Sequence, residues 1–227
     1  MEQEMKQEQV QAEKQETPKK QKKSKASYIV TPLIIIAVIA GAFIYWKSLV
    51  KPCITVNGEE IKIHMTVQEL VDAGYAIDDS IVGSGDLDIS KVSDIPGESY
   101  SSKSYYLYVE NEFGWYDYAN IVFQVYNKDV NSAEFKDCKV YSYQYDPSYR
   151  FNETSILIND IDFVGMDKED AVLAFEELGV KFDADDKEEF LSGEATSIIG
   201  KSGSYHFYIV TDVDRVTITK IEIRYNV

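Results

Sequence analysis

Residues 28–46 form a run of nineteen residues without a charged side chain. As a helix the run would extend roughly 28 Å, which is close to the hydrocarbon thickness of a bilayer. It is apolar around its whole circumference, whereas a helix at the edge of a soluble core keeps a polar face. The run therefore predicts a single transmembrane helix that divides the chain into a tail, a span and a C-terminal domain.

Basic residues beside the run predict its orientation. Five lysines lie between residues 19 and 25, whereas only Lys47 and Lys51 follow closely after the run. Because lysine and arginine stay on the cytoplasmic side, we expect residues 1–27 to form a cytoplasmic tail. The tail is rich in Glu, Gln and Lys and is predicted to be disordered. The sequence thus predicts a single-pass protein of the cell membrane, embedded in the lipid bilayer through residues 28–46, with an extracytoplasmic C-terminal domain.

Two other interpretations of the run are weighed against an uncleaved signal anchor. A cleaved signal peptide would use Ala40 to Ala42 as its small-residue site, but the apolar run continues beyond these residues. A lipoprotein would be acylated at Cys53, but the preceding Lys51 and Pro52 are not the small apolar residues that acylation requires. The signal anchor is therefore the favoured prediction.

The charge of the chain excludes one class of partner. The net charge is −16, and residues 1–27 carry +2, so the remainder carries −18. Nucleic-acid binding needs a basic surface, and we therefore expect no nucleic-acid partner. A solvated acidic surface is the simplest explanation of the excess.

The two cysteines, Cys53 and Cys138, both lie in the predicted extracytoplasmic domain, where disulfides persist. A bridge between them would stabilise the fold by roughly 4–5 kcal/mol at most in the chain-entropy model. The alternative is two buried thiols that do not meet. We predict the disulfide and leave the alternative open.

Two segments of the domain begin alike, which predicts two tandem α+β units at 47–146 and 155–227. Residues 54–63 alternate apolar and polar side chains around Asn57 and Gly58, and residues 156–163 repeat this outline. A short helix is predicted after each, the first capped by Thr66 and Glu69 and the second by Asp167. In each unit, later strands are expected to form an antiparallel sheet that packs against the helix.

Chemical motifs are few. The two histidines, His64 and His206, show no shared site, and no metal-ligand or cofactor-binding pattern is present. Asp183 and Asp185 resemble the start of a calcium loop, but Lys187 stands where an oxygen ligand is needed. We therefore predict no catalytic, metal or cofactor residues. The long loop at 78–103 is of a length typical of functional or disordered loops, and the sequence does not decide between them.

Tyrosine is the most suggestive side chain of the domain. The chain contains 17 tyrosines, and Tyr141, Tyr143 and Tyr145 alternate along one predicted strand. In a regular strand the three rings would share one face, where they could stack on sugars or hold an extended peptide. Ordinary cross-strand aromatic pairing is the alternative. These three residues are the predicted ligand-facing aromatics.

The order of these motifs resembles a group of uncharacterised membrane-anchored or lipoprotein-like envelope proteins of Gram-positive bacteria. The similar features are Asn57–Gly58, the helix at 66–74, the strand at 121–126 and the segment 136–140. Residues 165–170, which open the second helix, are similar to the helix-plus-sheet repeats of β-lactamase-inhibitor-like domains. The resemblance implies a non-catalytic binding or scaffolding module in the cell envelope.

The predicted function is therefore a membrane-tethered, non-catalytic binding module. Its partner would be an envelope protein or a cell-wall ligand. Two alternatives stay open: an envelope sensor that signals through the tail 1–27, and a calcium-dependent or hydrolytic envelope enzyme.

Overall fold

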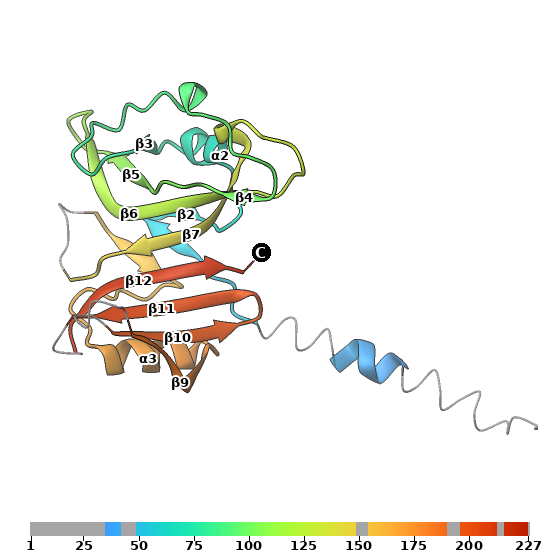
Figure 1. Ribbon diagram of the computed structural model, residues 1–227. Helices are drawn as coiled ribbons and strands as arrows, with labels where there is room; N and C mark the ends of the chain where they lie inside the picture. Colours follow the sequence, from blue (N-terminus) through green and yellow to red (C-terminus); the bar gives the residue numbers. More distant parts are fainter. Residues whose placement is uncertain (1–34, 42–48, 149–153, 190–195, 213–215, 227) are drawn as a thin grey trace, which may run out of the picture. The chain divides into compact units, whose positions relative to one another are not determined.

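The computed structural model of the chain describes residues 35–41, 49–148, 154–189, 196–212 and 216–226 (Figure 1). The chain divides into two compact units, Met1–Lys47 and Ser48–Val227. In the first unit, residues 35–41 are helical. All the strands of the described residues belong to the second unit.

The second unit contains two sheets and two short α-helices. The smaller sheet has the order β2-β1-β8, and the larger has the order β3-β5-β6-β7-β12-β11-β10-β9, with β4 paired to β6. The elements of the smaller sheet are β1 (Ile54–Val56), β2 (Glu59–Ile61) and β8 (Ile156–Ile158). The helices are α2 (Val67–Asp72) and α3 (Lys168–Glu177), with 3-10 turns η1 (Ile89–Lys91) and η2 (Phe135–Asp137). The strands of the larger sheet are β3 (Ala76–Asp78), β4 (Ser99–Tyr100), β5 (Tyr105–Glu110), β6 (Tyr116–Asn127), β7 (Lys139–Tyr145), β9 (Lys181–Glu189), β10 (Thr196–Ser202), β11 (Tyr205–Thr211) and β12 (Ile218–Tyr225).

The predicted fold class is wrong. The chain is mostly antiparallel sheet, and the predicted units at 47–146 and 155–227 do not each have a sheet of their own. Instead β7 of the first half pairs with β12 of the second, so that one sheet runs through both halves (Figure 1). Asp183 and Asp185, which looked like part of a loop, lie in β9. The local elements, by contrast, follow the sequence: Thr66 and Glu69 form the capping box of α2, and Asp167 caps α3.

The predicted membrane localisation is also corrected. Most of the predicted span, residues 28–34 and 42–46, lies outside the described residues, as does the tail 1–27. Within the part of the chain that the structure describes, no helix has both the length and the apolar character needed to cross a bilayer. The prediction of a single-pass membrane protein is not supported by this finding.

In each half of the large sheet, neighbouring strands follow one another in chain order from an edge to the centre. From one edge the order runs β3-β5-β6-β7, and from the other β9-β10-β11-β12, so that β7 and β12 meet at the centre. Tyr143 lies opposite Ile223, and Tyr145 lies opposite Ile221. The two halves are therefore related by an approximate two-fold axis between β7 and β12.

The smaller sheet shows the same two-fold relation in its hydrogen bonds. The backbone N–H of Asn57 donates to the carbonyl oxygen of Ser155 at 2.8 Å, and that of Asn159 donates to the carbonyl oxygen of Cys53 at 2.7 Å. The side-chain oxygen of each asparagine accepts in return from the backbone N–H of the same residue, at 2.9 Å from Ser155 and 3.2 Å from Cys53. Both asparagines adopt positive φ, of 51° and 50°, in tight turns.

The helices begin in equivalent ways. The cap of α2, Thr66, forms a β-bridge with Lys139 just as the cap of α3, Asp167, forms one with Thr217. In each case the first helical residue donates its backbone N–H to the residue before that bridge partner, at 3.1 Å in the first half and 3.0 Å in the second. Equivalent positions in the two halves can therefore be compared one by one.

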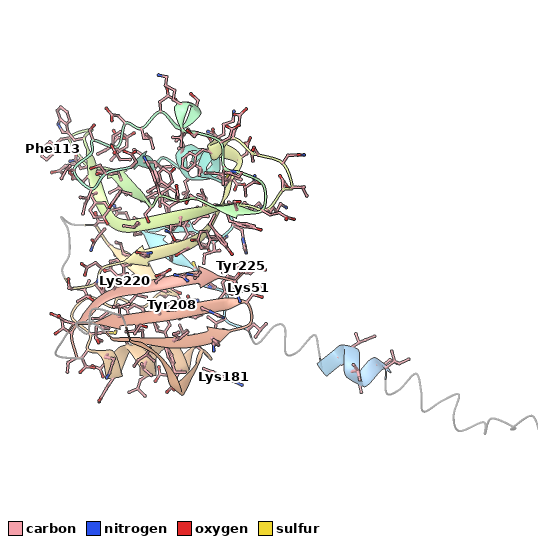
Figure 2. All side chains as sticks on the ribbon, in the orientation of Figure 1. Lys51, Phe113, Lys181, Tyr208, Lys220 and Tyr225 are labelled. Atoms are coloured by element: carbon pink, nitrogen blue, oxygen red, sulfur yellow. The ribbon has the colours of Figure 1, made fainter. Side chains whose placement is uncertain are left out.

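The core lies on the helix side of the large sheet. Phe175 of α3 packs on Phe163 at 4.7 Å and on Phe207 of β11 at 5.2 Å between ring centroids. On the opposite side of β12, the nearly buried Glu222 accepts from Ser142 at 3.0 Å and pairs with Arg224 at 2.7 Å. Tyr208 of β11 lies opposite Glu222, and Lys220 precedes Glu222 by two residues on β12 (Figure 2).

The reciprocal asparagine bonds predict a measurable loss of stability when one is removed. Asn159→Gly keeps the positive φ permissible but deletes the acceptor for the N–H of Cys53, so we expect the free energy of unfolding to fall by about 1–2 kcal/mol. Urea denaturation measures it. Asn131→Gly, at an exposed asparagine whose side chain makes no hydrogen bond with the described residues, serves as control. Equal effects of the two substitutions would contradict a stabilising role of the Asn159 side chain.

Candidate functional site

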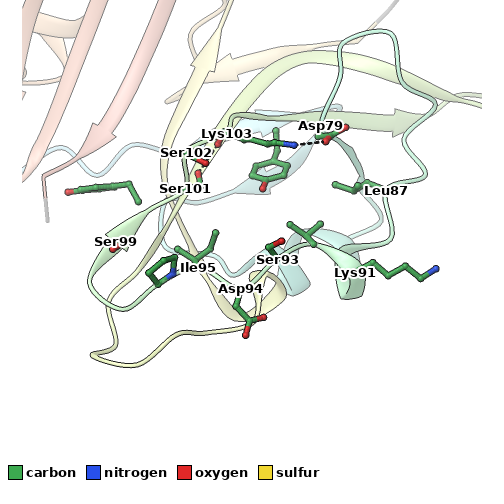
Figure 3. Close-up of a pocket in the computed structure, with 14 residues that line it drawn as sticks. Asp79, Leu87, Lys91, Ser93, Asp94, Ile95, Ser99, Ser101, Ser102 and Lys103 are labelled. Atoms are coloured by element: carbon green, nitrogen blue, oxygen red, sulfur yellow. Dashed lines mark hydrogen bonds and ion pairs between the residues drawn. The ribbon is translucent and has the colours of Figure 1, made fainter.

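One cavity among the described residues has a volume of about 620 Å³. It lies between residues 87–96 and 99–105, so the long loop that the sequence left undecided forms most of its wall (Figure 3). A cavity of this size falls in the range of small-molecule sites, about 300–1,000 Å³.

The first part of the loop is held by Asp78 at the end of β3. Its carboxylate accepts from the backbone N–H of Ser80 at 3.0 Å and from that of Gly85 at 3.3 Å. The hydroxyl of Tyr108 donates to the carbonyl oxygen of Ser80 at 2.8 Å. At Gly83 any side chain would clash, because a Cβ would lie 2.0 Å from the Asp78 carboxyl carbon. These contacts fix the conformation of residues 78–85, which lead into the loop that forms the cavity wall.

The far part of the loop is held by Asn127 at the end of β6. Its buried amide donates to the carbonyl oxygens of Ile95 at 2.9 Å and Asn131 at 2.8 Å. Ile95 also exchanges two backbone hydrogen bonds with Ala133, at 2.9 and 3.0 Å. A wall satisfied in this way by protein partners is pre-organised before any ligand arrives.

Polar groups of both signs line the cavity. The ammonium of Lys103 reaches the carboxylate of Asp79 at 3.2 Å across one side (Figure 3). Asp94 and the hydroxyls of Ser93 and Ser102 are exposed and have no hydrogen-bond partner among the described side chains and backbone. With Lys91 also in the wall, the lining carries two positive and two negative side chains. The cavity therefore has hydrogen-bonding capacity without a net charge.

Two tyrosine rings also line the cavity, beside aliphatic side chains that include Leu87, Val92 and Ile95. Tyr105 is buried against Phe135, with ring centroids 4.4 Å apart. Tyr100 is 48% exposed, and its ring contacts those of Tyr126 at 4.7 Å and Tyr141 at 4.5 Å. An exposed ring of this kind can pack against the apolar face of a ligand.

The predicted row of ligand-facing tyrosines is wrong for two of its three members. Tyr143 and Tyr145 are only 1% and 4% exposed and belong to the hydrophobic core. Tyr141 lies on the other face, where its hydroxyl donates to the side-chain oxygen of Gln124 at 2.6 Å. The reason is a register shift between β6 and β7 at Gln124, which interrupts the two-residue alternation of the strand.

The predicted disulfide is absent. Cys53 and Cys138 are free, and they precede strands of different sheets. The thiol of Cys53 donates to the carboxylate of Glu60 at 2.9 Å, and that of Cys138 to the carbonyl oxygen of Glu134 at 3.4 Å. Burial raises the pKa of each thiol to about 11, with the Glu60 carboxylate adding to the effect at Cys53.

Of the other candidates from the sequence, His64 precedes α2 and its ring contacts that of Tyr225, with centroids 4.2 Å apart, whereas His206 lies in β11 beside Tyr208. No cluster of three or more His, Cys, Asp or Glu side chains suited to a metal ion occurs among the described residues. The cavity itself was missed by motif reasoning, because its residues are close in space but share no motif. Its one signal in the sequence was the length of the 78–103 loop.

Comparison with known proteins gives no family for this chain. No protein-family model, no curated protein and no solved structure matches it.

The free thiols predict slow alkylation of the folded chain. Because both pKa values are raised to about 11, the thiols stay protonated near pH 8, and we expect iodoacetamide to label them much more slowly than in urea. Glu60→Gln should speed labelling of Cys53 and leave Cys138 unchanged. Peptide mass spectrometry without reductant measures both, and a linked 53–138 peptide would contradict the structure.

Proposed function

We propose that the chain is a non-catalytic binding module, and that the cavity between residues 87–96 and 99–105 holds a small, neutral, hydroxyl-rich ligand such as a sugar unit. The observation that carries the proposal is the cavity of about 620 Å³, whose wall contains polar groups without a partner among the described residues. The loop that forms this wall is hydrogen-bonded to Asp78 at the end of β3 and to Asn127 at the end of β6.

The hydrogen-bonding groups suit hydroxyls. Ser93 and Ser102 can both donate and accept, Asp94 accepts, and the Lys103–Asp79 pair offers a donor beside an acceptor. A vicinal pair of ligand hydroxyls could bond to both members of this ion pair. Because the charges of the lining balance, an ion gains little from entering, and a neutral polar ligand is favoured.

The tyrosines suit the apolar face of a sugar ring. Tyr100 is half exposed at the rim, and its position is fixed by pairing with Tyr126 across β4 and β6. Pre-organised rings and hydroxyls reduce the entropy lost on binding. Small-ligand sites combine aromatic and apolar side chains with a few placed polar groups that orient the ligand.

The proposal predicts saturable binding of a neutral sugar that depends on the ion pair. We would titrate the full chain with glucose, N-acetylglucosamine and their β-1,4-linked dimers by calorimetry and by NMR. Asp79→Asn and Lys103→Gln should each weaken binding by about tenfold, because each removes a charged hydrogen-bonding group. The matched control is Lys136→Gln, which breaks an exposed ion pair with Glu134 outside the cavity.

Absence of binding by all four sugars at millimolar concentration would overturn the proposal. So would binding that Lys136→Gln weakens as much as Lys103→Gln does, because the site would then lie elsewhere.

A further inference from the structure

A second cavity, of about 200 Å³, lies beside the first residues of β7 and the last residues of β12. Two lysines, a histidine, three tyrosines and a valine line it: His64, Tyr126, Lys128, Lys139, Val140, Tyr141 and Tyr225. None of them is acidic, although the chain has 39 Asp and Glu residues against 23 Lys and Arg. Figure 2 shows Tyr225 at the end of β12.

The lysines of this cavity differ from other lysines of the first half. Four of those others form ion pairs with N–O distances between 2.7 and 3.2 Å. Lys128 and Lys139 pair with no carboxylate of the described residues, so their charges are uncompensated by direct contact. The charge of Lys139 is close enough to His64 to lower the pKa of the imidazole, in addition to the larger effect of burial.

His64 occupies a backbone conformation that histidine adopts rarely. Its φ is +80°, and its N–H donates to the carbonyl oxygen of Val140 at 2.8 Å. The equivalent position in the second half, two residues before the helix cap, is Gly165, with a φ of +76°. Glycine adopts this conformation without strain. The fold therefore needs a left-handed residue at this point but has no need of an imidazole.

Lys139 can be compared with its counterpart in the second half in the same way. Lys139 bridges the cap of α2, whereas its counterpart at the cap of α3 is the uncharged Thr217. At these two positions, the described residues of the first half are His64 and Lys139, whereas those of the second half are the uncharged Gly165 and Thr217. Imidazole and ammonium groups that the backbone geometry does not require are candidates for ligand binding.

We propose that this cavity binds a phosphate monoester carried on a ring, with Lys128 and Lys139 contacting the phosphoryl group and the tyrosines contacting the ring. Two ammonium groups match the charge of about −1.5 to −2 that a phosphate monoester carries at neutral pH. The His64 ring, edge-on to Tyr225 with centroids 4.2 Å apart, closes one wall. A volume of 200 Å³ equals about seven water molecules at ~30 Å³ each, which suits one phosphoryl group and part of a ring.

The test uses phenyl phosphate as the probe, with inorganic phosphate and phenol as comparisons, titrated into the full chain by calorimetry. Phenyl phosphate should bind saturably, inorganic phosphate about tenfold more weakly, and phenol not measurably. Lys128→Gln and Lys139→Gln should each weaken phenyl phosphate by about tenfold or more, because each removes a charged contact. Lys136→Gln, at a lysine already paired with Glu134, is the control and should leave affinity unchanged.

Substitutions of His64 provide a second test, in which loss of binding can be distinguished from loss of folding. His64→Gly and His64→Ala should both weaken the binding of phenyl phosphate. The glycine variant should nevertheless have a higher melting temperature than the alanine variant, because glycine adopts the left-handed conformation without strain. The proposal is overturned if phenyl phosphate does not bind, if it binds no better than inorganic phosphate, or if the Lys128, Lys139 and His64 variants bind it like the unaltered chain.

Discussion

The antiparallel pairing of β7 with β12 is the contact on which the rest of the structure depends. On the core side, Tyr143 and Ile223 face each other, and both are almost fully buried. On the other side, Ser142 donates to Glu222, whose charge is balanced by Arg224. Apolar burial and a satisfied polar cluster thus reinforce the same pair of strands from opposite faces. Both cavities are lined by strands or loops of the sheet that this pairing completes.

Local elements were predictable from the sequence because their causes are local. The Thr66–Glu69 capping box and the Asp167 cap each satisfy helix N–H groups within one turn. The Asn57–Gly58 turn likewise fixes its own hairpin. Long-range features depend on contacts that no short pattern encodes. The register shift at Gln124 turns Tyr141 away from Tyr143, and the sequence 139–145 alone contains no sign of it.

The same distinction explains the errors about the site and the ends of the chain. A disulfide between Cys53 and Cys138 required the two thiols to meet, but pairing of β1 with β8 and of β7 with β12 places them before strands of different sheets. The apolar run 28–46 was interpreted from length and composition alone. The first cavity forms from the length of the 78–103 loop together with Asp78 and Asn127, whose contacts only the fold shows.

The approximate two-fold relation also separates what the fold requires from what it does not. Where both halves keep a feature, as with Asn57 and Asn159, a structural role accounts for it. Where they differ, as with His64 and Gly165, the backbone conformation at that position does not require the particular side chain. Two of the seven residues that line the second cavity, His64 and Lys139, differ from their counterparts in this way.

Hydrogen exchange of the full chain, followed by mass spectrometry, tests most directly whether one sheet unites the two halves. If β7 and β12 hold a single cooperative unit, the most protected amides of β6 and β7 will exchange with the same opening free energy as those of β11 and β12, and will shift together in denaturant. If the two sets differ by several kcal/mol and respond separately to denaturant, the halves are independent domains and the account is wrong.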